Sequence, residues 1–467
     1  MASTNCWRCL ARPSQRLLLA PASVVASTST SAAFSTSAQQ FSKAADDGGP
    51  SRHFRAGKKL VLGRKKRPLE RVKTPQSGER KAFRKRIMLT NDNALEVEGL
   101  DAFSPESAAD PESVGKVFGI PTGILDSLRA CEAFKPSQNW ALFRSPHTLV
   151  RTETVELIKQ ITEAVEKNET LRLVITGNRG SGKSVLGLQA LATGFLKNWV
   201  VINLPEGQDL TTAATEYAPI PNSEMFSQPV YIVKLMQTIY QTSQHILSEH
   251  KVELDHLHLP ISVTRSMTLA GLLSATKEPD FAWPVFKAFW QEILLPNRPP
   301  IMFCLDGLAH IMRVSDYRSP AFELIHSHDL SLVRMFTDAL GGKTTFPNGA
   351  AILGVISKGN APIIPSVEKA IAQRAAAQKG EPVPSRDPFF RKYDERVFEA
   401  LRDVRVLDVQ GVSKPEARAL MEYWAASGIL RLRVDAKNVS EKWTMAGGGV
   451  LAEMERVALY DIRAAAA

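Results

Sequence analysis

The chain has 467 residues, of which 44% are hydrophobic and 23% charged, and its formal net charge is +10. These values are ordinary for a globular protein of two or three domains, and no apolar run approaches the roughly 20 residues of a membrane-spanning helix, so we expect no membrane insertion. The four cysteines are too few for a disulfide framework, and the C-x-x-C of Cys6 and Cys9 lacks the second ligand pair of a zinc site.

Residues 1–45 predict a mitochondrial import presequence. They contain three arginines and many Ser, Thr and Ala, and no acidic residue precedes Asp46. A basic segment of this kind can form the amphipathic helix that mitochondrial import recognises. The alternative is a disordered Ser/Thr/Ala tail.

Residues 46–115 predict a basic, mostly disordered arm. Within it, residues 51–90 carry fifteen Lys and Arg against two Glu, so the rest of the chain is net negative. The arm has few large apolar residues and cannot bury enough surface to fold alone. Its charge suits the phosphates of RNA, which is the partner we expect, and a solvated linker is the alternative.

Residues 116–360 predict a nucleotide-binding domain with an α/β fold. Strands are expected at Leu171–Thr176, Trp199–Leu204, Ile301–Leu305 and Ala351–Ile356. Helices are expected at 151–167, 184–196, 227–249, 283–295 and 327–340. Strands that alternate with helices predict a parallel sheet with helices on both faces.

The remaining residues predict a smaller second domain. Residues 361–392 are rich in Pro, Ala, Lys and Arg and are expected to form an exposed excursion. Residues 393–467 are expected to form a small C-terminal domain, mostly helical and of winged-helix type, with a strand at Val404–Val409. Ser413 and Glu416 have the spacing of a capping box, which predicts that a helix begins there.

A P-loop follows the first expected strand. Residues 177–184 match G-x-x-x-x-G-K-[ST] and lie between an expected strand and an expected helix. Backbone N–H groups of such a loop face phosphate oxygens, and the helix N-terminus adds partial positive charge. We expect Lys183 to reach the β-phosphate and Ser184 to hold Mg²⁺. The predicted nucleotide-binding residues are Gly177, Asn178, Arg179, Gly180, Ser181, Gly182, Lys183 and Ser184.

Asp306 follows the expected strand Ile301–Leu305 and should lie at the carboxyl edge of the sheet. There it would join Ser184 as the predicted Mg²⁺ site, the alternative being an Asp that caps the next turn. Hydrolytic proteins of the additional-strand type usually place a Glu after this Asp, whereas this chain has Gly307. His310 is the nearest candidate base, and we predict no catalytic residue and little hydrolysis.

Two further groups of polar residues receive predictions. Ser357 follows the strand 351–356, where such folds place a polar γ-phosphate sensor, and we include it in the nucleotide site; a strand-end cap is the alternative. His326, His328 and Asp329 could suggest a metal site, but capping of the following helix explains them better. The chain has no N-K-x-D guanine-reading motif, which argues against a GTPase switch.

Several tracts together resemble the mitochondrial small-ribosomal-subunit protein 29 family, also called death-associated protein three, in its fungal branch. They are the P-loop 177–184, residues 305–307 (LDG), 325–330 (IHSHDL), 413–420 (SKPEARAL) and 422–430 (EYWAASGIL). With the leader and the basic arm, the resemblance covers roughly residues 80–460. The family's Asp-Gly pair matches Asp306-Gly307.

The resemblance implies a P-loop NTPase core (AAA+/STAND-like) with a C-terminal helical domain. It also implies a place in the mitochondrial matrix, in the small ribosomal subunit, with ribosomal RNA, neighbouring ribosomal proteins and, through bridges, the large subunit as partners. Members of the family bind guanine nucleotide, so GTP or GDP with Mg²⁺ is the expected cofactor, and ATP is the alternative.

Two functions are therefore compared. The first is a structural ribosomal protein whose bound nucleotide stabilises its fold, supporting mitochondrial translation. The second is an active AAA+-type ATPase that acts in assembly or on nucleic acid. Both use the P-loop, and Gly307 favours the first.

Overall fold

The computed structural model describes residues 87–359 and 361–460. The expected presequence at 1–45 and the most basic part of the expected arm lie outside these residues. Across the described residues, no helix combines the length and the apolar character that crossing a membrane requires.

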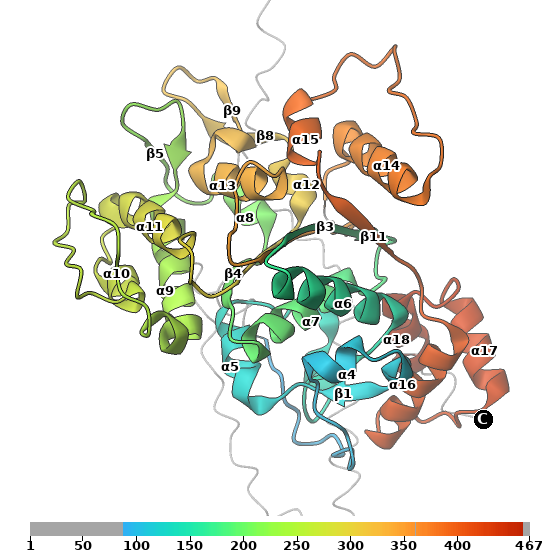
Figure 1. The fold of residues 1–467 in the computed structure, drawn as a ribbon. Coiled ribbons are helices and arrows are strands. Elements are labelled where there is room, and N and C mark those ends of the chain that lie inside the picture. The colour runs from blue at the N-terminus through green and yellow to red at the C-terminus, as the bar shows by residue number, and fades with distance from the viewer. Residues whose placement is uncertain (1–86, 360, 461–467) are drawn as a thin grey trace, which may run out of the picture. The chain divides into compact units, whose positions relative to one another are not determined.

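The central element of the described chain is a five-stranded parallel sheet in the order β11-β3-β10-β7-β4. Figure 1 labels its strands β3, β4 and β11. The strands of the sheet are β3 (Thr170–Gly177), β4 (Val200–Leu204), β7 (Ile301–Asp306), β10 (Ala350–Val355) and β11 (Arg405–Val409). β10 separates the strand that enters the P-loop from the strand that ends in Asp306. This order is that of additional-strand P-loop NTPases, so the predicted fold class is confirmed.

The sheet is covered on both faces because its strands are apolar on both sides. On β3, Leu173 and Ile175 pack against α6 (Thr152–Glu166) and α7 (Lys183–Leu196). Val174 between them faces the opposite core. The helices of that opposite core are α9 (Pro229–Leu247), α10 (Leu269–Ser274), α11 (Pro279–Ile293) and α13 (Ser331–Leu340). Figure 1 shows α6 and α7 close to β3, and α9, α10 and α11 grouped together beyond β4.

Shorter elements connect these layers. The other α-helices are α4 (Pro105–Ala109), α5 (Thr122–Ala130), α8 (Gly207–Thr211), α12 (Leu308–Ile311), α14 (Pro365–Lys379), α15 (Glu395–Ala400), α16 (Lys414–Ala426), α17 (Ala436–Met445) and α18 (Leu451–Leu459). The 3-10 helices are η2 (Pro111–Ser113), η3 (Pro136–Gln138), η4 (Trp140–Leu142) and η5 (Ser327–Asp329). Antiparallel pairs are β1 (Val117–Gly119) with β2 (His147–Leu149), β5 (Ala218–Pro219) with β6 (Phe226–Ser227), and β8 (Val314–Arg318) with β9 (Leu324–His326).

The folded part of the chain begins at an earlier residue than the composition indicated. Residues 87–115, which we assigned to the disordered arm, pack against the α/β core. Phe103 is 1% exposed and Leu89 is 2% exposed. Leu89, Phe103 and Ala108 of this stretch are therefore part of the core, which a regional average of charge and hydrophobicity does not reveal.

The region after residue 360 also differs from expectation. The expected excursion at 361–392 contains the helix α14, whose Val367 and Ala370 are buried. β11 pairs with β3 and so belongs to the central sheet, although we placed this strand in the C-terminal domain. The sheet therefore extends past the expected boundary at residue 393.

The described C-terminal residues form a helical unit of α16, α17 and α18, which lie together in Figure 1. The capping box at the start of α16 is confirmed, because the Ser413 side chain accepts from the Glu416 N–H and the Glu416 carboxylate accepts from the Ser413 N–H. Within residues 410–460 no strand follows β11, so the unit lacks the hairpin of a winged helix and that part of the expectation is wrong.

Candidate nucleotide-binding site

The P-loop joins the end of β3 to the start of α7. β3 ends at Gly177, and α7 begins at Lys183 with Gly182 as its N-cap residue. Gly177, Gly180 and Gly182 have φ angles of 135°, 76° and 97°. Residues with a side chain rarely adopt such φ angles, so glycine allows the tight turn that directs backbone N–H groups toward the interior of the loop. α7 is 14 residues long, and its N-terminus gives partial positive charge to this position.

All three glycines also leave room for neighbouring chain segments, and a Cβ on Gly182 would lie 2.7 Å from Cδ1 of Leu451. A Cβ on Gly177 would lie 2.3 Å from the carbonyl oxygen of Val409 in β11. A Cβ on Gly180 would lie 2.8 Å from the Cβ of Ala452 in α18. The N–H of Ala452 also donates to the Gly180 carbonyl at 3.0 Å. The start of α18 is therefore packed directly against the P-loop.

Lys183 is a buried cation in this loop. Its Nζ donates to the carbonyl of Gly177 at 3.1 Å and to that of Asn178. Burial lowers the pKa of Lys183 to about 8, and the positive charge of Lys358 acts in the same direction. Asp306 acts in the opposite direction. A phosphate beside Nζ would supply the negative charge that favours the ammonium form.

Ser184 and Asp306 meet at the carboxyl edge of the sheet, as predicted. The Ser184 hydroxyl donates to Oδ2 of Asp306 at 2.9 Å. Oδ1 of the same carboxylate is buried without a hydrogen-bond partner among the described residues. A hydroxyl beside a carboxylate with one unpaired oxygen is a ligand set that suits Mg²⁺, which prefers oxygen and keeps several waters.

A cavity of about 900 Å³ opens from the P-loop. Its volume falls in the upper range of small-molecule sites. It is lined by Arg179, Gly180, Gly182, Lys183 and Ser184 of the P-loop, by residues of the segment 137–154, and by residues of α16 and α18. Ser357, Lys358 and Gly359 also line it, as do residues of α7 and of the segment 445–450. The structure thus places Ser357 at the cavity, and its predicted role toward a γ-phosphate remains a prediction.

Gly177, Asn178 and Ser181, three of the eight predicted P-loop residues, are not among the residues that line the cavity. The carbonyls of Gly177 and Asn178 accept from Lys183. The carbonyl of Ser181 accepts from Arg151 at 2.9 Å, while the Ser181 hydroxyl is buried without a partner in the described part of the chain. These residues hold the loop in shape through their backbone groups.

One end of the cavity has an aromatic wall. Trp140, Phe143 and His147 line it, and the His147 ring lies 4.4 Å from the Phe143 ring, centroid to centroid. Burial lowers the pKa of His147 to about 4, so its ring is neutral near pH 7. Thr148 and Gln189 add hydrogen-bonding groups to the same lining. Rings with a few polar groups can hold a planar base.

Sequence reasoning missed several residues of this site. Arg151 is 5% exposed and bridges the P-loop to the end of β11, donating to the carbonyls of Ser181 and Gln410. Lys135 lies 3.4 Å from Oδ2 of Asp306, measured from its Nζ. No motif marks either residue, because each reaches the site from a distant part of the chain.

The residue after Asp306 in the sequence is not a Glu. Gly307 follows, with a φ of 81°, and is the N-cap of α12. His310 is buried on α12, and burial lowers its pKa. The lowered pKa leaves His310 neutral near pH 7.

The expected capping is confirmed for His326 alone, which caps the 3-10 helix η5, whereas α13 has no side-chain hydrogen bond at its N-cap residue Leu330. Nδ1 of His326 accepts from the N–H of His328 at 3.1 Å. Asp329 pairs with Arg396 at 3.0 Å. No group of three or more His, Cys, Asp or Glu side chains in the described chain is arranged to hold a metal ion.

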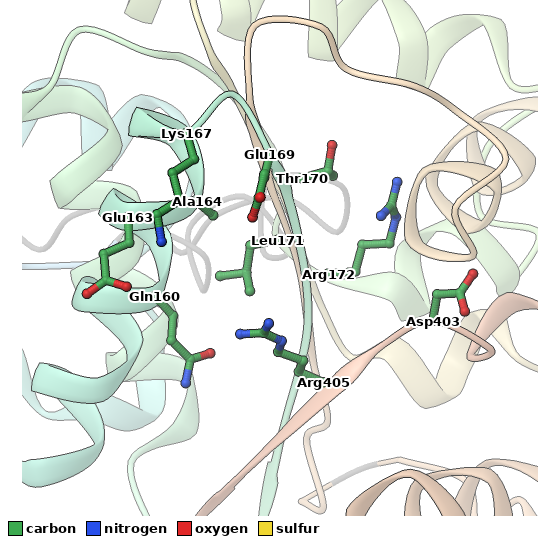
Figure 2. Close-up of a pocket in the computed structure, with 10 residues that line it drawn as sticks. All are labelled: Gln160, Glu163, Ala164, Lys167, Glu169, Thr170, Leu171, Arg172, Asp403 and Arg405. Carbon is green, nitrogen blue, oxygen red and sulfur yellow. The ribbon is translucent and has the colours of Figure 1, made fainter. Parts of the chain in front are cut away.

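A smaller cavity of about 350 Å³ lies at the opposite edge of the sheet, where β3 and β11 begin. Figure 2 shows its mixed lining, with Lys167, Arg172 and Arg405 among acidic and polar side chains. Ligands of open α/β sheets bind at the carboxyl ends of the strands, where the P-loop lies. We therefore place the candidate site in the larger cavity.

Comparison with known proteins identifies the same family as the sequence tracts described above. A family model described as mitochondrial ribosomal death-associated protein 3 matches residues 148–457, more than half of the chain. The chain belongs to this family. The resemblance drawn from the P-loop, the Asp-Gly pair and the C-terminal tracts is thereby confirmed.

Two fungal relatives show how far the similarity extends. "Small ribosomal subunit protein mS29" of Neurospora crassa is 48% identical over 470 residues, covering 99% of this chain and 100% of the relative. The protein of the same name in Schizosaccharomyces pombe is 20% identical over 370 residues, covering 78% of this chain and 75% of the relative. A solved structure, the Walker-type ATPase of Pyrococcus abyssi, matches with a TM-score of 0.35 and 15% identity, covering 66% of this chain and 68% of that one.

Proposed function

We propose that this protein is a structural constituent of the mitochondrial small ribosomal subunit that holds a purine nucleotide in its P-loop. The ribosomal role rests on the family and on the 48% identity to a small-subunit protein over almost the whole chain. The proposed location is the mitochondrial matrix. The proposed partners are small-subunit ribosomal RNA, neighbouring ribosomal proteins and, through intersubunit bridges, the large subunit.

The nucleotide is proposed to be GTP or GDP with Mg²⁺, with ATP as the alternative. The observation that carries this proposal is the P-loop at the mouth of a cavity of about 900 Å³. Backbone amides and Lys183 would hold the phosphates, and Ser184 and Asp306 would hold the metal. When bound, Mg²⁺ would neutralise phosphate charge.

The proposed role of the nucleotide is stability rather than turnover. The C-terminal helix α18 contacts the P-loop directly, so a nucleotide bound there would link the central sheet to the C-terminal helices. A ligand that binds only the folded state stabilises it by mass action. Little hydrolysis is proposed, because Gly307 stands where a water-polarising Glu would be expected.

The test compares Lys183→Ala with Lys197→Ala, which changes the lysine at the C-terminal end of the same helix. Nucleotide released from each denatured protein is identified by mass spectrometry, and incorporation into small subunits is measured in mitochondria. Lys183→Ala is expected to lose nucleotide and assembly together, while Lys197→Ala keeps both. Normal assembly of a Lys183→Ala protein shown to be empty would contradict the proposal.

A further inference from the structure

Lys135 places a cation beside Ser184 and Asp306, the proposed metal ligands, and it lies in a loop with a well-defined backbone. The backbone N–H of Lys135 donates to Oε1 of Gln138 at 2.7 Å. Phe134 before it is 3% exposed and packs edge-on against Trp140, with ring centroids 5.3 Å apart. The Lys135 side chain is only 15% exposed. These contacts fix the backbone from which the side chain extends.

The ammonium group of Lys135 points to two acceptors at the carboxyl edge of the sheet. Nζ lies 3.4 Å from Oδ2 of Asp306, whose side chain is 14% exposed. Nζ also donates to the carbonyl of Pro205, just after β4. Oδ2 of Asp306 therefore has both the Ser184 hydroxyl and Lys135 beside it.

The charges around Asp306 indicate what the ion pair between Lys135 and Asp306 does. Lys135 pairs with the carboxylate, and Lys183 and His310 interact with it electrostatically from the P-loop and from α12. His310 is neutral near pH 7. Without a counter-charge, the Asp306 carboxylate would repel a nucleotide phosphate arriving at the P-loop. A divalent metal normally supplies that counter-charge, and here an ammonium group already does.

We propose that Lys135 is a tethered counter-ion of Asp306 that lets the P-loop hold a nucleoside diphosphate without a divalent metal. Lys135 and a metal ion then compete for one carboxylate, because two cations at the same oxygens repel each other. This inference rests on the proposed nucleotide site and adds how its charge is balanced. It makes metal an option for this site rather than a requirement.

The experiment measures GDP affinity of the full chain by isothermal titration calorimetry, with saturating Mg²⁺ and with excess EDTA. An opposite charge at this distance shifts the pKa of a carboxyl group by about one to three units, which is about one to three powers of ten in the equilibrium constant. When Mg²⁺ is removed, the GDP affinity of the unmodified protein is expected to fall by about threefold or less. The GDP affinity of Lys135→Met is expected to fall by about tenfold or more. Lys234→Met, at an exposed lysine paired with Glu132, is the matched control and should behave like the unmodified protein.

A double variant separates charge balance from loop structure. Adding Asp306→Asn to Lys135→Met removes the unbalanced carboxylate, so binding in EDTA should return to within about threefold of the unmodified protein. A merely structural role of Lys135 would not be rescued in this way. A large loss of affinity in EDTA by the unmodified protein, or an equally small loss in Lys135→Met, would overturn the inference.

Binding of the metal alone keeps this test separate from the nucleotide proposal. In the absence of nucleotide, Lys135→Met should bind Mn²⁺ about tenfold more tightly, measured by electron paramagnetic resonance, because the competing ammonium is gone. Unchanged Mn²⁺ affinity would overturn the counter-ion role. If the unmodified chain bound no GDP even with Mg²⁺, the proposed nucleotide function would fail, while the Mn²⁺ comparison would still decide the role of Lys135 at Asp306.

Discussion

At the scale of single residues, the site is built from buried charges that have partners close at hand. Lys183 has the carbonyls of its own loop, Asp306 has Ser184 and Lys135, and Glu455 on α18 accepts from Nδ2 of Asn139 at 2.7 Å. Burying a charge is costly unless it is paired. Glu455 has a single neutral amide as its hydrogen-bond partner, whereas the Asp306 carboxylate has the ammonium group of Lys135 beside it.

Glu455→Gln is expected to stabilise the protein above pH 6. Burial raises the pKa of Glu455 to about 6 from 4.5, although the bond from Asn139 acts against this. The ionised form is therefore less favourable in the folded state, and stability falls as pH rises through this range and stays low above it. Glutamine keeps an acceptor for Asn139 without the charge. The free energy of unfolding at pH 7.5 should rise by about 1 kcal/mol once partial exposure is considered.

Denaturant titrations at pH 5 and pH 7.5 measure this effect. Glu453→Gln on the same helix is the control, because Glu453 is 49% exposed and pairs with Arg456 at the surface. The gain should be larger at pH 7.5 than at pH 5 for Glu455→Gln, and absent for the control. Equal gains at both pH values would rule out the charge of Glu455 as the cause.

At the scale of elements, the P-loop is supported by segments that lie far from it in sequence. β11 pairs with β3 in parallel up to Val409 beside Gly177. Arg151 at the start of α6 ties the loop to the residue after β11. α18 closes the loop from the other side through Ala452. The loop's shape therefore depends on the position of β11 and of the C-terminal helices.

Gly177→Ala is expected to disrupt the junction of β3 and β11. The new methyl group would lie 2.3 Å from a backbone oxygen of Val409, at a φ of 135° that side chains rarely adopt. Strain and overpacking together should lower the free energy of unfolding by about 2–4 kcal/mol and weaken nucleotide binding.

Chemical denaturation and GDP titration report the two effects of Gly177→Ala. Gly123→Ala in α5 is the matched control, because nothing lies within 4 Å of its added methyl group. In the control, alanine should raise helix stability by up to about 1 kcal/mol. A Gly177→Ala protein as stable as the control would contradict the close packing of β11 against the P-loop.

At the scale of the whole molecule, the described residues 87–359 and 361–460 belong to one compact unit. The C-terminal helices share their hydrophobic core with the segment before α6, because Phe143 and Leu149 of that segment pack with Met421 and Trp424 of α16. The cavity at the P-loop, where we propose nucleotide binding, is lined by residues of both segments. Folding of the C-terminal helices and formation of the site should therefore be coupled.

GDP is expected to raise the melting temperature of this unit as a whole. At a ligand concentration about 100 times the dissociation constant, the stabilisation is about 2.7 kcal/mol, which corresponds to about 3 °C for a unit of this size. Differential scanning calorimetry should show one transition that shifts with GDP, and no shift for Lys183→Ala. Two transitions, of which the C-terminal one ignores GDP, would show that the helices fold independently.

The sequence alone determined the features that depend on neighbouring residues. The P-loop 177–184, the Asp-Gly pair at 306–307, the alternation of strands and helices and the capping box of α16 are all local patterns. They could be predicted because backbone conformation and periodic burial are set within a few residues. The same local averages misled at 87–115, where sparse apolar residues are buried.

The tertiary structure alone decided which distant segments complete the site. It placed β11 beside β3, α18 on the P-loop, and Lys135 beside Asp306. These contacts join residues far apart in the chain and carry no motif. They arise because the strand order β11-β3-β10-β7-β4 brings the ends of distant segments together, and that order determines which side chains meet at the carboxyl edge of the sheet.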